Sequence, residues 1–171
     1  MIESSFSNAS FLLVCPEHKL QELKILFTNS FPQAYIYAIA SIRLTKNFSK
    51  SLFSENTEIK KEIEEANWIV LSSSFAAQIF LEEIETEANL KEKLKQKKFA
   101  SVGPSVSQLL ERNGLVVALE SPSLNIEGLN QAFESMLQEK EVANTKFLFI
   151  TGNKTASGSL MNELEQKGAN C

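Results

Sequence analysis

A chain of 171 residues is long enough to bury a hydrophobic core, as one domain or as one domain with a fragment of another. Its 43% hydrophobic and 22% charged residues are typical of a soluble globular protein, and no apolar run is long enough to cross a bilayer. The net charge of -4 argues against a nucleic-acid-binding protein. Two cysteines and one histidine give no metal-ligand spacing, so we expect no metal and no other cofactor. The start of the chain lacks the basic residues of a signal peptide, which makes the cytoplasm the expected location.

The N-terminal stretch predicts a strand, a helix and a second strand. Phe11–Val14 is an apolar run that ends before Pro16. Leucines at helical spacing follow, and Pro32 stops that helix. Tyr35–Leu44 alternates loosely, with Ile39 breaking the pattern, and we expect it to form a long second strand.

A polar stretch at residues 47–56 marks the predicted boundary between two domains. Residues 1–46 then form an incomplete N-terminal piece of a first α/β domain, and residues 47–171 form a second α/β domain. Because an apolar strand edge without neighbours needs cover, we expect this incomplete piece to associate with a second copy, giving a homo-oligomer, or with the larger domain.

One stretch sets the pattern for the rest of the chain. Trp68–Leu71 is an apolar run rich in β-branched and aromatic residues, which is typical of a buried strand. Ser72–Ser74 breaks the run, and apolar residues at helical spacing continue to Ile84. The serines therefore lie where a strand ends and a helix begins. At such a point, free N–H groups and the helix dipole favour an anionic ligand.

The same succession of strand, turn and helix recurs three more times. Its strands are predicted at Phe99–Val102, Leu115–Leu119 and Lys146–Ile150. Alternating strands and helices imply a parallel sheet covered on both faces, so we expect an α/β, flavodoxin-like fold. Right-handed crossovers would then bring four turns to one sheet edge, namely Ser72–Ser74, Gly103–Ser105, Ser121–Asn125 and Thr151–Thr155.

The end of the chain and one basic run complete the pattern. After Gly168 a further strand is expected, but three residues remain. The run Lys91–Lys98 is either the solvated end of a helix or a binding patch, and short runs of like charge usually face water.

Several segments, taken in order, resemble those of the uroporphyrinogen-III synthase family. Its strand and turn "Asp-Trp-(apolar)-(apolar)-Phe-Thr-Ser", its "Val-Gly-Pro" segment and its "Ala-Glu-Gly-Leu" helix start all have counterparts here. So do an apolar strand followed by glycine and the opening "Leu-(apolar)-(apolar)-Arg-Pro". These counterparts are Asn67–Ser73, Phe99–Pro104, Ile126–Leu129, Phe147–Ile150 and Leu12–Pro16.

The chain departs from this family at four points. Val106 stands where the family commonly has Thr, and Cys15 stands where it has Arg. No Arg lies between Thr155 and Leu160, where one is common. The last third of the family pattern, which completes the first domain, would lie beyond Cys171.

The resemblance implies a lyase of tetrapyrrole (haem) biosynthesis. Such an enzyme cyclises the linear tetrapyrrole hydroxymethylbilane to uroporphyrinogen III, with inversion of ring D and loss of water. Because the substrate is a polycarboxylate and the chain is acidic, backbone N–H groups at helix N-termini must supply the local attraction. The expected partner is this small molecule, with no nucleic acid and no membrane.

We expect the substrate to lie against the turns at the predicted edge. The protein would then act by positioning the substrate rather than by transferring a proton. No catalytic residue can be named from the sequence. Helix capping and ordinary turn chemistry are competing explanations for the same residues. The predicted substrate-binding residues are Ser72, Ser73, Ser74, Gly103, Ser105, Gly152 and Asn153.

A second functional class remains open at the level of sequence. The chain can instead be a non-catalytic α/β module that binds a small anion or a partner subunit. The missing last third of the family pattern distinguishes the two classes, because a lyase that works as one chain requires both walls of its cleft.

Overall fold

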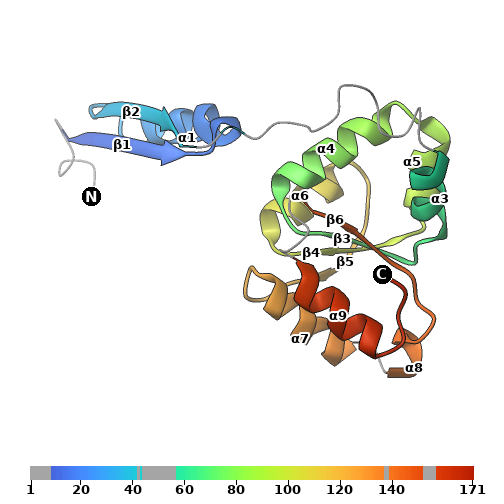
Figure 1. Cartoon of the computed structure of the whole chain (residues 1–171). Helices are drawn as coiled ribbons and strands as arrows, with labels where there is room; N and C mark the ends of the chain where they lie inside the picture. The colour runs from blue at the N-terminus through green and yellow to red at the C-terminus, as the bar shows by residue number, and fades with distance from the viewer. Residues whose placement is uncertain (1–8, 42, 44–56, 137–138, 152–156) are drawn as a thin grey trace. The chain divides into compact units, whose positions relative to one another are not determined.

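A computed structural model describes most of the chain, and the chain divides into two compact units (Figure 1). Unit 1 is Met1–Asn47 and unit 2 is Phe48–Cys171. The described residues are 9–41, 43, 57–136, 139–151 and 157–171.

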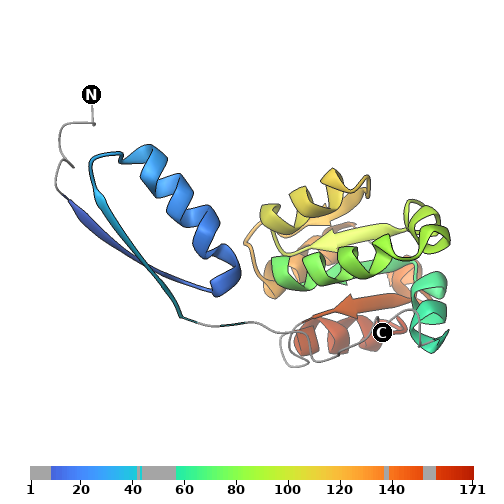
Figure 2. The ribbon, with the colours of Figure 1, turned by 90° about the horizontal axis from the view of Figure 1, so that it is seen from above.

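Unit 1 is one strand–helix–strand crossover. Strand β1 (Ser10–Cys15) and strand β2 (Tyr35–Ala40) pair in parallel, and helix α1 (Glu17–Ser30) connects them (Figure 2). The expected strand–helix–strand order is therefore confirmed. Strand β2 ends at Ala40, earlier than the predicted Leu44, and the residue that follows it is a bend.

Three phenylalanine rings hold α1 against the inner face of the strands. The ring of Phe11 on β1 lies 5.7 Å from that of Phe27 and 5.0 Å from that of Phe31, measured between centroids. Phe11, Leu13, Ile36 and Ala38 are half-buried on the side of the helix and Cys15 is buried, while the residues that alternate with them are exposed. One face of this small sheet is thus covered by α1.

Unit 2 contains a four-stranded parallel sheet in the order β5-β4-β3-β6. Its strands are β3 (Trp68–Leu71), β4 (Lys98–Ser101), β5 (Val117–Glu120) and β6 (Phe147–Ile150). Its helices are α3 (Thr57–Glu65), α4 (Ser74–Glu85), α5 (Ala88–Leu94), α6 (Pro104–Arg112), α7 (Ile126–Met136), α8 (Glu139–Val142) and α9 (Gly158–Gln166). The predicted α/β fold with a parallel sheet is confirmed.

The strand order contains one reversal of direction. From β3 the chain steps outward to β4 and β5, and it then returns to place β6 on the other side of β3. A parallel bridge between Lys146 and Asn170 extends the sheet beyond β6, where the sequence predicts a further strand. Counted along the chain from β3, the spatial order of the four strands and this bridge is 3-2-1-4-5. The flavodoxin order 2-1-3-4-5 is obtained only after a cyclic permutation that counts β6 and the bridge first.

Helices cover both faces of this sheet (Figure 1). On one face, Ile69 and Leu71 of β3 join a core cluster with residues of α3, α4, α5 and α6. On the other face, Trp68 and Val70 of the same strand join a cluster with α7 and α9. The Trp68 ring lies 5.1 Å from that of Phe133, centroid to centroid. Because β3 supplies side chains to both cores, its sequence is a continuous apolar run.

Two helical features were not anticipated by the sequence. The run that includes Lys91–Lys98 contains a separate short helix, α5, and α8 precedes β6. Lys93 pairs with Glu64 of α3 at 2.7 Å and Lys95 pairs with Glu92 at 2.7 Å, so ion pairs hold part of the basic run at the surface. None of the described helices is long and apolar enough to cross a membrane.

Candidate functional site

The carboxyl ends of the four strands of unit 2 lie level at one edge of the sheet. Leu71 of β3 is paired in register with Ser101 of β4 and with Ile150 of β6. Ser101 is in turn paired with Glu120, the last residue of β5. The turns that follow β3, β4 and β5 therefore start at the same edge, as the sequence predicts. Gly152 and Asn153, which follow β6, lie outside the described residues.

The serine turn after β3 starts helix α4. The Ser73 backbone is extended and its Oγ accepts a hydrogen bond from the Ala76 N–H at 3.1 Å, so Ser73 is the N-cap. The Ser72 N–H donates to the Ile150 carbonyl at 3.5 Å, which ties this turn to β6. Within the described part of the chain, no hydrogen bond occupies the hydroxyls of Ser72 and Ser74. These half-buried hydroxyls remain available to a ligand.

The turn after β4 is narrow because Gly103 lies against Leu124. A Cβ atom on Gly103 would lie 3.1 Å from Cδ2 of Leu124, so any larger residue would push against that side chain. Leu124 is 65% exposed and has a φ of 58°, a left-handed conformation that costs about 1–2 kcal/mol for a non-glycine residue. Ser105, in the first turn of α6, is exposed. Strain of this kind is found at functional sites, and no local pattern around Leu124 predicts it.

A buried hydrogen-bond chain behind this turn was also missed. Ser101 Oγ and Ser107 Oγ are 2.7 Å apart, and the Ser107 hydroxyl donates to the carboxylate of Glu120. Ser101 is fully buried and Ser107 is 6% exposed. Val106, which stands at the family's Thr position, has its side chain in the core instead. Only the register between β4 and β5 brings Ser101 and Glu120 together, so spacing in the sequence could not reveal this chain.

The turn after β5 uses its polar groups internally. Asn125 caps α7, because its Oδ1 accepts a hydrogen bond from the Gly128 N–H at 2.7 Å. The hydroxyls of Ser121 and Ser123 donate to Asn125 as well, at 2.8 Å and 2.9 Å. With these groups occupied and Glu120 beside them, this end of the edge is poorly suited to an anion.

Ser157 marks the start of α9, the helix that follows β6. Its side chain is fully buried, and its Oγ has no hydrogen-bond partner among the described residues. An unpaired buried hydroxyl costs about 1–3 kcal/mol, so an orphan of this kind calls for a functional explanation. The sequence analysis did not single out Ser157.

The point at which the strand order reverses lies between β3 and β6. In open α/β sheets a ligand binds outside the carboxyl ends of the strands at such a point. Helices α4, α6 and α9 begin at this edge, and none of them carries an acidic residue in its first turn. Their positive dipole ends are therefore not neutralised, which favours a negatively charged group. Helix α7 differs, because Glu127 lies in its first turn.

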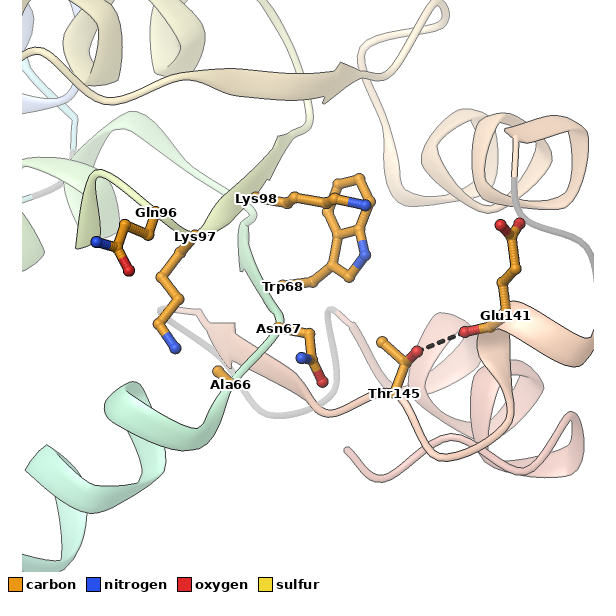
Figure 3. A pocket seen from close by; sticks show the side chains of 8 residues that line it. All are labelled: Ala66, Asn67, Trp68, Gln96, Lys97, Lys98, Glu141 and Thr145. Atoms are coloured by element: carbon orange, nitrogen blue, oxygen red, sulfur yellow. Dashed lines mark hydrogen bonds between the residues drawn. The ribbon is translucent and has the colours of Figure 1, made fainter. Parts of the chain in front are cut away.

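A polar hollow of about 320 Å³ lies at the opposite, amino edge of the sheet (Figure 3). Its lining comes from the segments that precede β3, β4 and β6. The Lys98 ammonium lies over the Trp68 ring, 5.4 Å from its centroid, and the Lys97 ammonium donates to the Glu64 carbonyl. The sequence-predicted site residues do not line this hollow, which is formed by Ala66, Asn67, Trp68, Gln96, Lys97, Lys98, Glu141 and Thr145.

Neither edge has the features of a metal or thiol centre in the described part of the chain. No group of three His, Cys, Asp or Glu side chains there could hold a metal ion. Burial and the nearby Glu165 raise the pKa of the Cys171 thiol to about 11, so this thiol is protonated and unreactive at neutral pH.

Comparison with known proteins places these features in a family. A family model described as uroporphyrinogen-III synthase HemD matches residues 39–171. No curated protein matches the chain by sequence.

Solved structures share its fold at low sequence identity. The chain is similar to a mutant uroporphyrinogen III synthase from the extremely thermophilic bacterium Thermus thermophilus, with a TM-score of 0.61 and 10% identity over 95% of this chain. The wild-type enzyme from the same organism matches with a TM-score of 0.52 and 10% identity over 93% of this chain. The chain spans 59% and 58% of the length of these two structures. The family match covers most of the sequence and includes the whole carboxyl edge, and the chain therefore belongs to the uroporphyrinogen-III synthase family.

Proposed function

We propose that this chain acts as a uroporphyrinogen-III synthase, a lyase that cyclises hydroxymethylbilane with inversion of ring D and loss of water. Membership of the family supports the reaction type. The observation that carries the proposal is the side-by-side start of α4 and α6 at one sheet edge, with no acidic residue in either first turn. This arrangement suits a substrate with many carboxylate arms.

The protein's part in this reaction is to bind and orient the substrate. Hydrogen bonds to charged groups contribute about 1.5–3 kcal/mol each, so a few N–H groups and hydroxyls at the edge suffice for useful binding. The hydroxyls of Ser72 and Ser74 and the first turn of α6 at Ser105 would hold carboxylate arms. Fixing the arms aligns the ends of the linear tetrapyrrole, which lowers the entropic part of the barrier to ring closure.

The direct experiment is an isomer assay on the purified chain. Hydroxymethylbilane is generated in situ, the chain is added, and the oxidised uroporphyrin isomers are separated. We expect isomer III above the level in a reaction without the chain. If isomer I alone forms, as in spontaneous closure, the chain has no synthase activity by itself.

A non-catalytic module that binds a small anion or a partner subunit is the second candidate. The amino-edge hollow favours it, because Lys98 stands there above the single tryptophan of the chain. The two candidates differ in a simple readout. Titration with inorganic phosphate should change Trp68 fluorescence if the hollow binds anions, and should leave it unchanged if the carboxyl edge alone does.

A further inference from the structure

Leu124 has a backbone conformation that its residue type disfavours. Among the described residues, Leu124 and Asn144 are the non-glycine residues with a positive φ, at 58° and 67°. Asparagine adopts this left-handed conformation readily, because its short polar side chain can bond to the local backbone. Leucine rarely does, since its Cβ crowds the following carbonyl oxygen. The residue type therefore explains the conformation at Asn144 but not the one at Leu124.

The turn after β5 requires a left-handed residue at this position, but it does not require a leucine. Leu124 lies between Ser123 and Asn125, whose side chains hydrogen-bond to each other, and Asn125 caps α7. A glycine or an asparagine would allow the same turn with less strain. Packing does not compensate for the strain, because Leu124 is 65% exposed. Strain that persists in this way points to a function of the side chain.

The Leu124 side chain lies at the carboxyl edge, over the start of helix α6. A Cβ atom on Gly103, the N-cap of α6, would lie 3.1 Å from Leu124 Cδ2. An apolar group is thus placed beside a helix start that carries no acidic residue in its first turn. The bridge at Asn170 extends the sheet on the side of β6, whereas Leu124 follows β5 at the other side. A strand that continues from this bridge would therefore not cover Leu124.

A leucine beside an anion-binding turn suits a ligand that combines apolar ring faces with carboxylate arms. A polycarboxylate tetrapyrrole has this character, because each pyrrole ring has an apolar face. Neighbouring strands of a sheet are about 5 Å apart, and β3 is the neighbour of β4. A ring that rests on Leu124 can therefore extend one arm to the start of α6 and another to the serine turn before α4.

We propose that Leu124 is the apolar contact of the carboxyl-edge site, and that its side chain packs against the face of one pyrrole ring of the tetrapyrrole. This inference rests on the proposed function and adds to it a contact that orients a ring rather than an arm. Carboxylate contacts alone leave a ring free to turn about its bridging carbons. A contact with the ring face restricts that rotation and so helps to align the ends that must join.

Binding of uroporphyrin to the full chain, followed by the fluorescence of this stable polycarboxylate, provides the first test. Leu124→Gly and Leu124→Asn suit a left-handed backbone but remove the apolar contact. Each should raise the dissociation constant about tenfold, as expected when most of a leucine side chain loses its apolar cover. The free energy of unfolding should stay constant or rise. Leu124→Met, which keeps an apolar side chain, should bind nearly as the wild type does.

Asn144→Gly is the matched control for these variants. It places glycine at the other left-handed position, in the turn that precedes β6 at the amino edge. This change should leave the dissociation constant of uroporphyrin unchanged. Equal affinity in wild type and Leu124→Gly would overturn the inference. A loss of affinity that accompanies a loss of stability would also overturn it, because Leu124 would then be a structural residue.

The methyl groups of Leu124 provide a second readout, which a structural role would not move. The ring current of a porphyrin shifts proton resonances strongly and only at short range. In the methyl-labelled chain, the Leu124 signals, assigned by their absence in Leu124→Gly, should move upfield on saturation with uroporphyrin. Signals that stay in place while uroporphyrin binds would overturn the inference and leave the proposed function standing. A wild-type chain that does not bind uroporphyrin would contradict the carboxyl-edge site itself, and this inference with it.

Discussion

Ser101 and Ser107 share a buried hydrogen bond of 2.7 Å, which links the end of β4 to the first turns of α6. Replacing Ser107 with alanine leaves the Ser101 hydroxyl with a 3.4 Å contact to the Gly103 carbonyl as its remaining bond. We expect Ser107→Ala to lower the free energy of unfolding by about 1–3 kcal/mol, measured by urea denaturation. The exposed neighbour provides the control, because Ser105→Ala should change stability by less than about 0.5 kcal/mol. Equal losses in both variants would contradict the assigned hydrogen-bond chain.

Gly128 and Gly158 lie in the first turns of two helices but in different surroundings. A Cβ atom on Gly128 would lie 1.9 Å from Ser123 Oγ and 2.6 Å from Ser121 Oγ, while one on Gly158 would meet nothing within 4 Å. Gly128→Ala should therefore lower the free energy of unfolding by about 1–3 kcal/mol, because the turn after β5 must move. Gly158→Ala should be neutral or raise it by about 0.4–1 kcal/mol. Thermal unfolding monitored by circular dichroism distinguishes the pair, and the reverse order would contradict the close approach of Gly128 to the two serine hydroxyls.

The orphan hydroxyl of Ser157 gives a prediction that separates stability from function. Ser157→Ala removes a buried hydroxyl that has no partner among the described residues, so the free energy of unfolding should stay constant or rise by about 1 kcal/mol. If the hydroxyl serves the substrate, the same variant should produce less isomer III. A clear loss of stability instead would mean that the hydroxyl has a partner within the folded chain.

Lys146 predicts a pH-dependent contribution to stability at the amino edge. Hydrogen bonds to Glu62 and then Glu65 raise the pKa of Lys146 above its ordinary 10.5, and the bond to Lys146 lowers the pKa of Glu65 below its ordinary 4.5. The carboxylate's contribution is present above pH 4.5 and is lost as pH falls through its lowered pKa. The ammonium's contribution is present below pH 10.5 and is lost as pH rises through its raised pKa.

The stability difference between wild type and Lys146→Met should therefore be largest between these two limits and shrink at acidic pH. Urea denaturation at neutral and acidic pH measures it. Lys95→Met is the control, because the Lys95–Glu92 pair is an exposed one within a single helical segment and should contribute little at either pH. A Lys146→Met penalty that does not vary with pH would indicate lost packing rather than lost charge.

The sequence predicted the features of the carboxyl edge that depend on local pattern. The run Trp68–Leu71 and the serines after it specify a buried strand and a capped helix. A strand buried on two faces is a continuous apolar run, and a helix cap is commonly a serine, so both can be recognised from neighbouring residues in the sequence. The parallel order of the elements then places the turns on one edge. Ser73 was predicted as a cap or a ligand contact, and the structure gives it the capping role.

The features that the sequence missed depend on which strands are neighbours. Ser101 meets Glu120 through Ser107 only because β4 pairs with β5 in one register. Gly103 approaches Leu124 only because their two turns lie side by side, and glycine in a turn was already explained by local chemistry. The loose alternation of Tyr35–Ala40 indicated a strand but not which of its faces α1 would cover.

The central claim is that a carboxylate-rich tetrapyrrole binds at the helix starts of the carboxyl edge. Backbone amide resonances of the isotope-labelled chain, followed during titration with the stable polycarboxylate uroporphyrin, test it most directly. The account predicts shifts at the carboxyl-edge turns, those at Ser72–Ser74 and Gly103–Ser105 among them, with Asn67 and Lys98 at the opposite edge unchanged. Shifts confined to Asn67 and Lys98, or no shifts at saturating ligand, would contradict it.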